Sequence, residues 1–398
     1  MERIIKLLGI AGFLVVGFSC FANIKNVPFK LNQVIEYCEY SVWSISPAEP
    51  ILNVSRDLYF KKVSQDINLI IKTGDSQIGG TLTVPDKHNS SSLVILISGS
   101  GDQDRDETLE GFKIFKAIAE HLASRGIASF RYDDRGVGES TGDFVNSTLD
   151  DHSNDLEHIM DYFKTTKKYA FSEFILFGHS QGGIVASKVA VSNAHVRKLI
   201  LMGAPAVPLV EVVLYQVRYE YKDTIICKSL IEANVSAHNR LMRAIKDNKN
   251  INEALSFYRE SIKSILYESS IPKDVVDTLK IEQEAIGKAE ELKVIYGLPS
   301  LTSFLYYNPS EDLEKLKVPV LALFGGLDFQ VPIHQNKDRM ENALLKSETD
   351  YHFITFDNAN HFFQEAKTGE RDEYSKLEKK FVANFLNEIS DWIIGNRL

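Results

Sequence analysis

The chain has 398 residues, of which 44% are hydrophobic and 25% are charged. This composition is ordinary for a globular protein, and it excludes a disordered, collagen-like or small disulfide-scaffold chain. The length predicts one large domain or two ordinary ones. The formal net charge of -9 argues against a nucleic-acid partner, because phosphate binding depends on clustered Lys and Arg.

Residues 1–22 have the layout of a secretory signal peptide. Arg3 and Lys6 precede an uncharged apolar run that ends at the small residue Ala22. We expect cleavage after Ala22, a secreted or periplasmic mature chain, and no stable membrane span after cleavage. A membrane anchor is the alternative, but the run falls short of the ~20 residues that a spanning helix needs. Acylation of Cys20 is less favoured, because the residues before it lack the aliphatic lead of a lipobox.

The cysteines that remain after cleavage are Cys38 and Cys227. Export would permit a disulfide between them, but distant cysteines cannot be paired from sequence, and no metal-ligand spacing is present. Residues 23–65 show no clear periodicity and are left as an N-terminal extension without an assigned structure.

From residue 66 the hydrophobic pattern becomes regular. The segment INLIIK, the pair Gly79 and Gly80, and the segment TLTVP predict two short strands around a turn. The continuous apolar run LVILIS at 93–98 is typical of a strand that is buried on both faces.

Apolar runs and helical patterns then alternate, which predicts parallel strands joined by crossover helices. The later predicted strands cover residues 127–132, 174–178, 198–203, 318–325 and 351–356, and the predicted helices cover 112–124, 149–165, the segment after 178, and 374–394. Between residues 210 and 305 the pattern is strongly helical without a convincing strand, so we expect an inserted helical segment.

The strongest chemical signal is GHSQG at 178–182, a G-x-S-x-G between a predicted strand and a helical pattern. A nucleophile elbow needs such a tight turn, with small residues flanking a strained serine. The N-terminus of the following helix also favours developing negative charge. We therefore expect Ser180 to be a nucleophile. The alternative is a serine that only caps the helix.

A nucleophilic serine needs a base, and the base needs an acid that fixes its tautomer. In a sheet of this kind both lie on loops after later strands, in the order Ser, Asp or Glu, His. Asp328 and His361 each follow a predicted strand in that order and are the expected acid and base. The residues set aside are Asp357 on the loop of His361, His352 within a strand, His334 at a helix start, and His179, the variable residue of the elbow.

An oxyanion hole is the third requirement. One expected donor is the backbone N–H of Gln181, the residue after the nucleophile, and the other is that of Ser100 in the glycine-rich loop 98–101. Such a loop could also hold a phosphate, but it lacks the G-x-x-x-x-G-K-[ST] and G-x-G-x-x-G spacings.

Five motifs together resemble the α/β-hydrolase superfamily, and more narrowly its bacterial carboxylesterase branch, often labelled serine aminopeptidase-like or dienelactone-hydrolase-like. They are SGSGDQDRD (98–106), YDDRGVGES (132–140), GHSQGG (178–183), GGLDFQVP (325–332) and NANHFFQEAKTG (358–369). The resemblance implies an α/β fold with a mostly parallel central sheet flanked by helices, and a helical cap inserted before the strand that carries Asp328. It also implies ester hydrolysis through an acyl-enzyme.

On this basis the chain divides into a signal peptide (1–22), an N-terminal extension (23–65), a first part of the α/β-hydrolase core (66–205), a helical cap (206–312) and a second part of the core (313–398). Two features depart from the family's pattern. The extension has no counterpart in the minimal fold, and Leu327 stands just before the acid, where relatives often carry a charged residue. The loop 133–140 matches a structural turn of the superfamily.

We expect a serine hydrolase of small-molecule carboxylic esters that needs no cofactor and no metal. A thioesterase, an acyltransferase or a peptidase would use the same triad, and a catalytically silent binding protein on this fold is the alternative of another class. Arg105, which lies beside the oxyanion loop, is expected to pair with a nearby acid. The candidates are Asp102, Asp104 and Asp106.

Six apolar or aromatic residues of the cap could roof an acyl pocket, although most are expected to form the core of the cap itself. They are Leu214, Tyr215, Tyr219, Phe257, Tyr258 and Phe304.

Overall fold

The structure is a computed structural model that describes residues 64–395, apart from 88–89, 170 and 271–276. The predicted signal peptide, nearly all of the extension, Cys20 and Cys38 lie outside the described residues, so the predictions on them stay predictions. Cys227 is exposed. No helix in the described part of the chain is long and apolar enough to cross a membrane.

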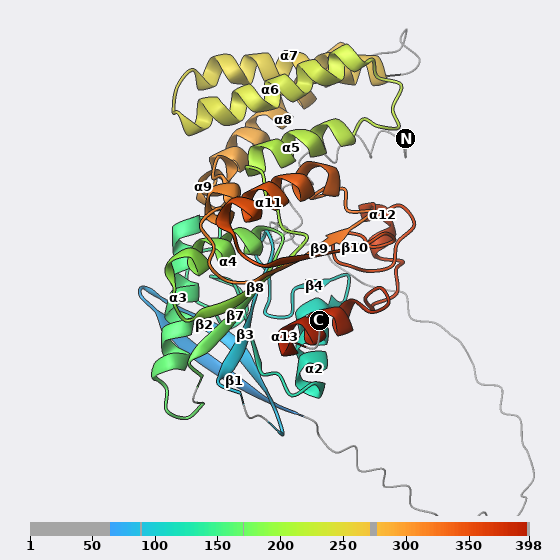
Figure 1. Cartoon of the computed structure of the whole chain (residues 1–398). Helices are drawn as coiled ribbons and strands as arrows, with labels where there is room; N and C mark the ends of the chain where they lie inside the picture. The colour runs from blue at the N-terminus through green and yellow to red at the C-terminus, as the bar shows by residue number, and fades with distance from the viewer. Residues whose placement is uncertain (1–63, 88–89, 170, 271–276, 396–398) are drawn as a thin grey trace, which may run out of the picture.

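An eight-stranded sheet forms the centre of the molecule, in the order β1-β2-β6-β3-β7-β8-β9-β10 (Figure 1). Only β2 pairs antiparallel with both of its neighbours, and the six strands from β6 to β10 run parallel. The strands are β1 (Ser64–Thr73), β2 (Ser76–Pro85), β3 (Ser92–Ile97), β6 (Ser129–Tyr132), β7 (Glu173–His179), β8 (Val196–Met202), β9 (Val320–Gly325) and β10 (Tyr351–Phe356); β4 (Thr108–Leu109) and β5 (Phe112–Lys113) form a separate small pair. The predicted α/β class with a mostly parallel sheet is confirmed.

Helices cover both faces of this sheet. One face packs against α3 (Leu149–Thr165), α4 (Gln181–Ser192) and α11 (Ile333–Ser347), and the other against α2 (Ile114–Ser124) and α13 (Phe385–Ile394). In β3, Leu93, Ile95 and Ile97 belong to the first core, whereas Val94 and Leu96 belong to the second. Side chains of a strand point alternately to its two faces, so an uninterrupted apolar run is what a strand between two helical layers requires.

Between β8 and β9 the described part of the chain contains six helices. They are α5 (Leu209–Tyr219), α6 (Lys228–Lys246), α7 (Ile251–Ser269), α8 (Thr278–Gly297), α9 (Pro299–Leu305) and α10 (Pro309–Leu313). Figure 1 shows α6, α7 and α8 as the layer farthest from the sheet, with α5 between that layer and the sheet. Buried Leu241, Tyr258 and Ile265 contribute to an apolar core that these helices share. We call α5–α9 the cap.

The predicted turn at Gly79 and Gly80 is wrong. Both glycines lie inside β2, and the hairpin turns instead after Thr73, which pairs with Ser76. A Cβ atom on Gly80 would lie 2.3 Å from the ring of Phe130 in β6. The glycine therefore permits two strands to pack closely, and it does not form a turn.

The predicted helix over 374–394 is also wrong over its first half. The structure has a short α12 (Arg371–Tyr374) and then no helix until α13 begins at Phe385. Between them Phe381 forms a bridge with Gln364, and the Val382 N–H donates to the Phe363 carbonyl at 2.8 Å. These hydrogen bonds to a distant loop replace the helical ones, which the apolar spacing alone could not reveal.

Candidate active site

Ser180 lies on the sharp turn between β7 and α4. Its φ of +50° and ψ of -120° fall in a region that non-glycine residues rarely occupy. A Cβ on Gly178 would lie 2.4 Å from the carbonyl oxygen of Gly182, and a Cβ on Gly182 would lie 2.3 Å from that of Ile97. Both flanking glycines are therefore required by the backbone. The Ser180 side chain makes no capping hydrogen bond to α4, so a helix cap does not explain it.

His361 and Asp328 lie together at the carboxyl ends of the neighbouring strands. His361 Nδ1 is 2.7 Å from Asp328 Oδ2, and the residues are 3% and 6% exposed. The other carboxylate oxygen of Asp328 accepts the N–H groups of Gln330 at 2.8 Å and Val331 at 2.9 Å. The carboxylate therefore holds a proton on Nδ1 and leaves Nε2 as the basic nitrogen of His361.

Backbone hydrogen bonds bring the serine turn to this pair. The Ser180 N–H donates to the Met202 carbonyl at 2.9 Å. The next residue, Gly203, lies so close to the acid and base that a Cβ there would be 3.3 Å from His361 Nδ1. Among the described residues no hydrogen bond joins the Ser180 hydroxyl to His361. Such a bond is often long or misaligned in the absence of substrate.

The two predicted oxyanion residues line the same cavity. Ser100, Ser180 and Gln181 all line it, and Gln181 begins α4, where backbone N–H groups have no partner within the helix. The neighbouring Gly99 N–H is already engaged, because it donates to Glu107 Oε1 at 2.8 Å. Within this loop the geometry therefore favours Ser100 over Gly99 as a donor.

Two family sequence models match the chain. The one described as "Serine aminopeptidase, S33" matches residues 108–265, and the one described as "Dienelactone hydrolase family" matches residues 294–390. The chain has the α/β-hydrolase fold, and both matching models describe α/β-hydrolases. The predicted resemblance, which rested on the five motifs, is confirmed, including its labels as serine aminopeptidase-like and dienelactone-hydrolase-like.

Esterase EstD of Thermotoga maritima is 24% identical to this α/β-hydrolase over 317 residues, which make up 79% of this chain and 65% of that protein. The chain thus spans just under two thirds of the length of that relative. An esterase structure from Pyrococcus furiosus is 12% identical to this chain, with a TM-score of 0.48. The matched region covers 83% of this chain and 93% of the esterase chain. A proline iminopeptidase structure from Mycobacterium smegmatis is 15% identical to this chain, with a TM-score of 0.44. The matched region covers 82% of this chain and 100% of the iminopeptidase chain.

A second buried histidine and carboxylate pair supports the site of this α/β-hydrolase. His179 Nδ1 lies 2.7 Å from Glu107 Oε1, and His179 Nε2 donates to the carbonyl oxygen of His361 at 3.1 Å. Burial disfavours the charged form of His179, but the charge and hydrogen bond of Glu107 outweigh it and raise the pKa of His179. Both ring nitrogens are occupied, so His179 positions its neighbours and cannot act as the base.

Sequence reasoning missed Glu107 altogether. Its side chain joins the oxyanion loop, through Gly99, to the elbow, through His179. It is 2% exposed and has a positive φ of 47°. The one signal in the sequence was its place directly after the motif SGSGDQDRD.

The predicted partners of Arg105 are wrong. Its guanidinium pairs with Asp133, at 3.1 Å from Nε, and with Glu139, at 2.7 Å from Nη2. Asp106 pairs instead with Arg131 at 2.7 Å. The turn 133–140 follows β6, and the fold brings it against the oxyanion loop. That turn also has a structural role, as the resemblance implies, because its carboxylates fix the loop.

The cavity, of about 80 Å³, lies between the core and the cap. Four residues of α5 line it with the helical spacing i, i+3, i+4 and i+7: Leu209, Val212, Val213 and Gln216. None of the six cap residues named from the sequence lines it. Tyr258 is buried in the cap core, Phe304 belongs to the main core, and Phe257 is exposed. The spacing that begins just after Pro208 was the signal that could have identified this face.

Proposed function

We propose that this protein is a serine hydrolase that cleaves small-molecule carboxylic esters through a Ser-His-Asp triad. The observation that carries the proposal is Ser180 in its strained turn at the wall of a cavity, beside the buried pair of His361 and Asp328. The relationship to esterase EstD supports an ester as substrate. We expect no cofactor or metal to take part.

In the proposed mechanism, His361 Nε2 removes the proton of Ser180 Oγ as that oxygen attacks the ester carbonyl. The backbone N–H groups of Ser100 and Gln181 stabilise the oxyanion. His361 then donates the proton to the oxygen of the leaving alcohol, and the C–O bond breaks to give the acyl-enzyme. Water, deprotonated by His361, then attacks the acyl group. The bond between Ser180 Oγ and the acyl carbon breaks as His361 returns the proton to Oγ, which releases the acid and free Ser180. Asp328 stabilises the imidazolium in both steps.

A peptidase is the second candidate, since one matching family model bears that label. Peptidases that recognise a free amino terminus need a negative group to pair with the ammonium. The residues that line this cavity are Ser, Gly, Gln and apolar residues, all uncharged, which favours a neutral ester. A thioesterase or acyltransferase would use the same machinery, and a silent binding protein would lack turnover altogether.

We also propose that the mature protein is exported and begins at Asn23. The support is the charged start and the apolar run of residues 1–22. Expression of the full chain in a bacterial host, followed by cell fractionation and N-terminal sequencing, tests it. An uncleaved chain in the cytoplasm, or a lipid on Cys20, would overturn this localisation.

The catalytic proposal is tested with purified mature protein and p-nitrophenyl esters of increasing acyl length. We expect turnover that is highest for short chains and is abolished in Ser180→Ala. Ser300→Ala, a change in a second serine that lines the same cavity, serves as the matched control and should still be labelled by a fluorophosphonate. A wild-type protein that neither hydrolyses any ester nor reacts with the fluorophosphonate would favour the silent binding protein.

A further inference from the structure

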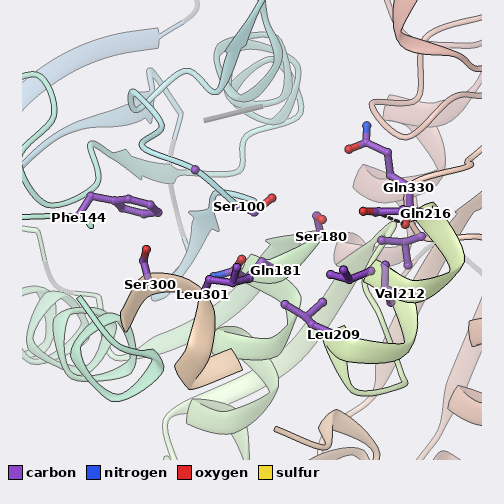
Figure 2. Close-up of a pocket in the computed structure, with 13 residues that line it drawn as sticks. Ser100, Phe144, Ser180, Gln181, Leu209, Val212, Gln216, Ser300, Leu301 and Gln330 are labelled. Atoms are coloured by element: carbon purple, nitrogen blue, oxygen red, sulfur yellow. Dashed lines mark hydrogen bonds between the residues drawn. The ribbon is translucent and has the colours of Figure 1, made fainter. Parts of the chain in front are cut away.

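The cavity has two chemically different ends on either side of Ser180. Figure 2 shows Phe144 and Ser300 on one side of Ser180, and Gln216 and Gln330 on the other. The first end carries the ring of Phe144 and the hydroxyl of Ser300. The second carries two primary amides, each on a residue that is less than a tenth exposed.

The amide of Gln216 has a fixed orientation. Its Nε2 lies 2.8 Å from the backbone carbonyl oxygen of Gln330. A carbonyl can only accept a hydrogen bond, so the NH₂ group must be at this end of the amide. The Oε1 atom is therefore the free end of a side chain that lines the cavity, and no described residue donates a hydrogen bond to it.

The amide of Gln330 is held by a side-chain hydroxyl. Its Nε2 lies 3.0 Å from the hydroxyl of buried Tyr374. Gln330 also lines the cavity, and its Oε1 receives no hydrogen bond from the described part of the chain. Each of these two residues thus lines the same end of the site and has an amide oxygen to which no described residue donates a hydrogen bond. Such an oxygen is available to accept a hydrogen bond from a ligand that supplies a donor.

This end of the cavity lies on the side of the acid and base. The backbone N–H of Gln330 donates to Asp328, and the ring of Tyr374 packs on Phe362, the neighbour of His361, with ring centroids 5.6 Å apart. In ester cleavage the histidine must protonate the leaving oxygen, so the alcohol part of the substrate lies on the side of His361. The amide end is therefore the place for the alcohol.

We propose that Gln216 and Gln330 form a subsite that accepts hydrogen bonds from hydroxyl groups on the alcohol part of the ester. The substrate is then an ester of an uncharged polyhydroxy alcohol, such as a glycerol or sugar ester. A carboxylate would suit an ammonium group better, and both acceptors here are neutral. This inference rests on the hydrolase function proposed above.

The test compares two esters of the same acid and nearly the same shape: 2-hydroxyethyl butyrate and propyl butyrate. They differ in a terminal hydroxyl against a methyl group. Release of butyric acid is followed in a pH-stat. We expect kcat/KM of the wild type to be about tenfold higher for the hydroxyethyl ester, because a site built to hydrogen-bond a hydroxyl discriminates against its absence.

Gln216→Leu and Gln330→Leu should each lower this ratio toward one. A ratio measured within one variant does not depend on the fraction of protein that is folded, so partial misfolding does not obscure the result. Ser300→Ala, at the opposite end of the cavity, should keep the wild-type ratio.

A wild-type ratio near one, or a high ratio that both glutamine variants retain, would overturn the subsite. So would protein that is labelled by a fluorophosphonate but hydrolyses neither ester. Protein that is neither labelled nor active would instead overturn the proposed hydrolase function itself. The two failures are therefore distinguishable.

Discussion

Two buried pairs of histidine and carboxylate lie side by side in this molecule. His361 with Asp328 and His179 with Glu107 have the same Nδ1–O distance of 2.7 Å, and the two rings lie with centroids 4.7 Å apart. They differ at the second ring nitrogen. Nε2 of His179 donates to the carbonyl of His361, whereas Nε2 of His361 has no hydrogen-bond partner among the described residues.

This difference teaches how one combination of residue types can serve two roles. A base needs a nitrogen lone pair that is free to accept a proton, and a histidine with both nitrogens occupied offers none. The raised pKa of His179 and the nearby carboxylate favour an imidazolium that donates on both sides. This difference is why the proposed mechanism uses His361 as the base, whereas His179 holds the backbone around it.

The largest expected effect comes from removing the base. His361→Ala should lower kcat on p-nitrophenyl butyrate by about 10⁵- to 10⁶-fold, as loss of a triad member does when the triad acts as a unit. His179→Gln should lower kcat by only about 10- to 100-fold, since it disturbs positions and removes no base. Steady-state kinetics with matched thermal melts measures both. Equal losses in two well-folded variants would contradict the division of roles.

Asp328→Asn should cost about 10⁴-fold in kcat/KM. The NH₂ group of the amide would donate to Nδ1 of His361, and this leaves the proton on Nε2, which then cannot accept one from Ser180. Asp357→Asn is the matched control, because Asp357 lies on the loop of His361 but is exposed. We expect the control to keep its activity. A similar loss in both variants would point to the loop and not to the carboxylate.

A smaller effect is expected for Glu107→Gln, about 10- to 100-fold in kcat with less change in KM. The amide oxygen can still accept the Gly99 N–H and a proton of His179, because both meet Oε1, but the negative charge that supports a protonated His179 is lost. Glu110→Gln, an exposed neighbour on the same segment, should behave like the wild type. A rise in KM with an unchanged kcat would indicate that Glu107 affects substrate binding and not the transition state.

The smallest effect concerns stability and pH. The pKa of His179 is raised by folding, so Glu107 and the imidazolium stabilise the protein fully below the unfolded pKa of ~6.5. This contribution is lost as the pH rises through the folded pKa. The difference in Tm between wild type and Glu107→Gln should therefore be larger at pH 6 than at pH 9, by a few degrees. Thermal melts at both values measure it, and a difference that grows with pH would contradict the charged pair.

The sequence was sufficient where the determining interactions are local. The strained turn at Ser180 needs small residues at 178 and 182, and the strands buried on both faces need continuous apolar runs, so both leave a readable pattern. The parallel sheet, the superfamily and the order of Ser180, Asp328 and His361 could all be read in this way. The structure places the last two together as the pattern requires.

The sequence was insufficient where the partner is distant along the chain. Glu107 and His179 are separated by 72 residues, and Arg105 lies 28 residues from Asp133. Neither pairing has a local signature, and Arg105 was therefore assigned to the acids beside it. The face of α5 that lines the cavity was missed for the same reason, because several apolar faces of the cap compete for burial.

What the sequence by itself determined is thus the backbone plan: which segments are strands or helices, and which serine, acid and histidine end the strands at one edge of the sheet. Only the tertiary structure decided how those ends are held. Contacts with a distant loop replace a helix over 375–384, and Gly80 packs closely against the ring of Phe130. The carboxylate of Glu107 contacts His179 in the turn that carries Ser180. Local conformation depends on neighbours in the chain, whereas hydrogen bonds and ion pairs depend on neighbours in space, and only folding brings those together.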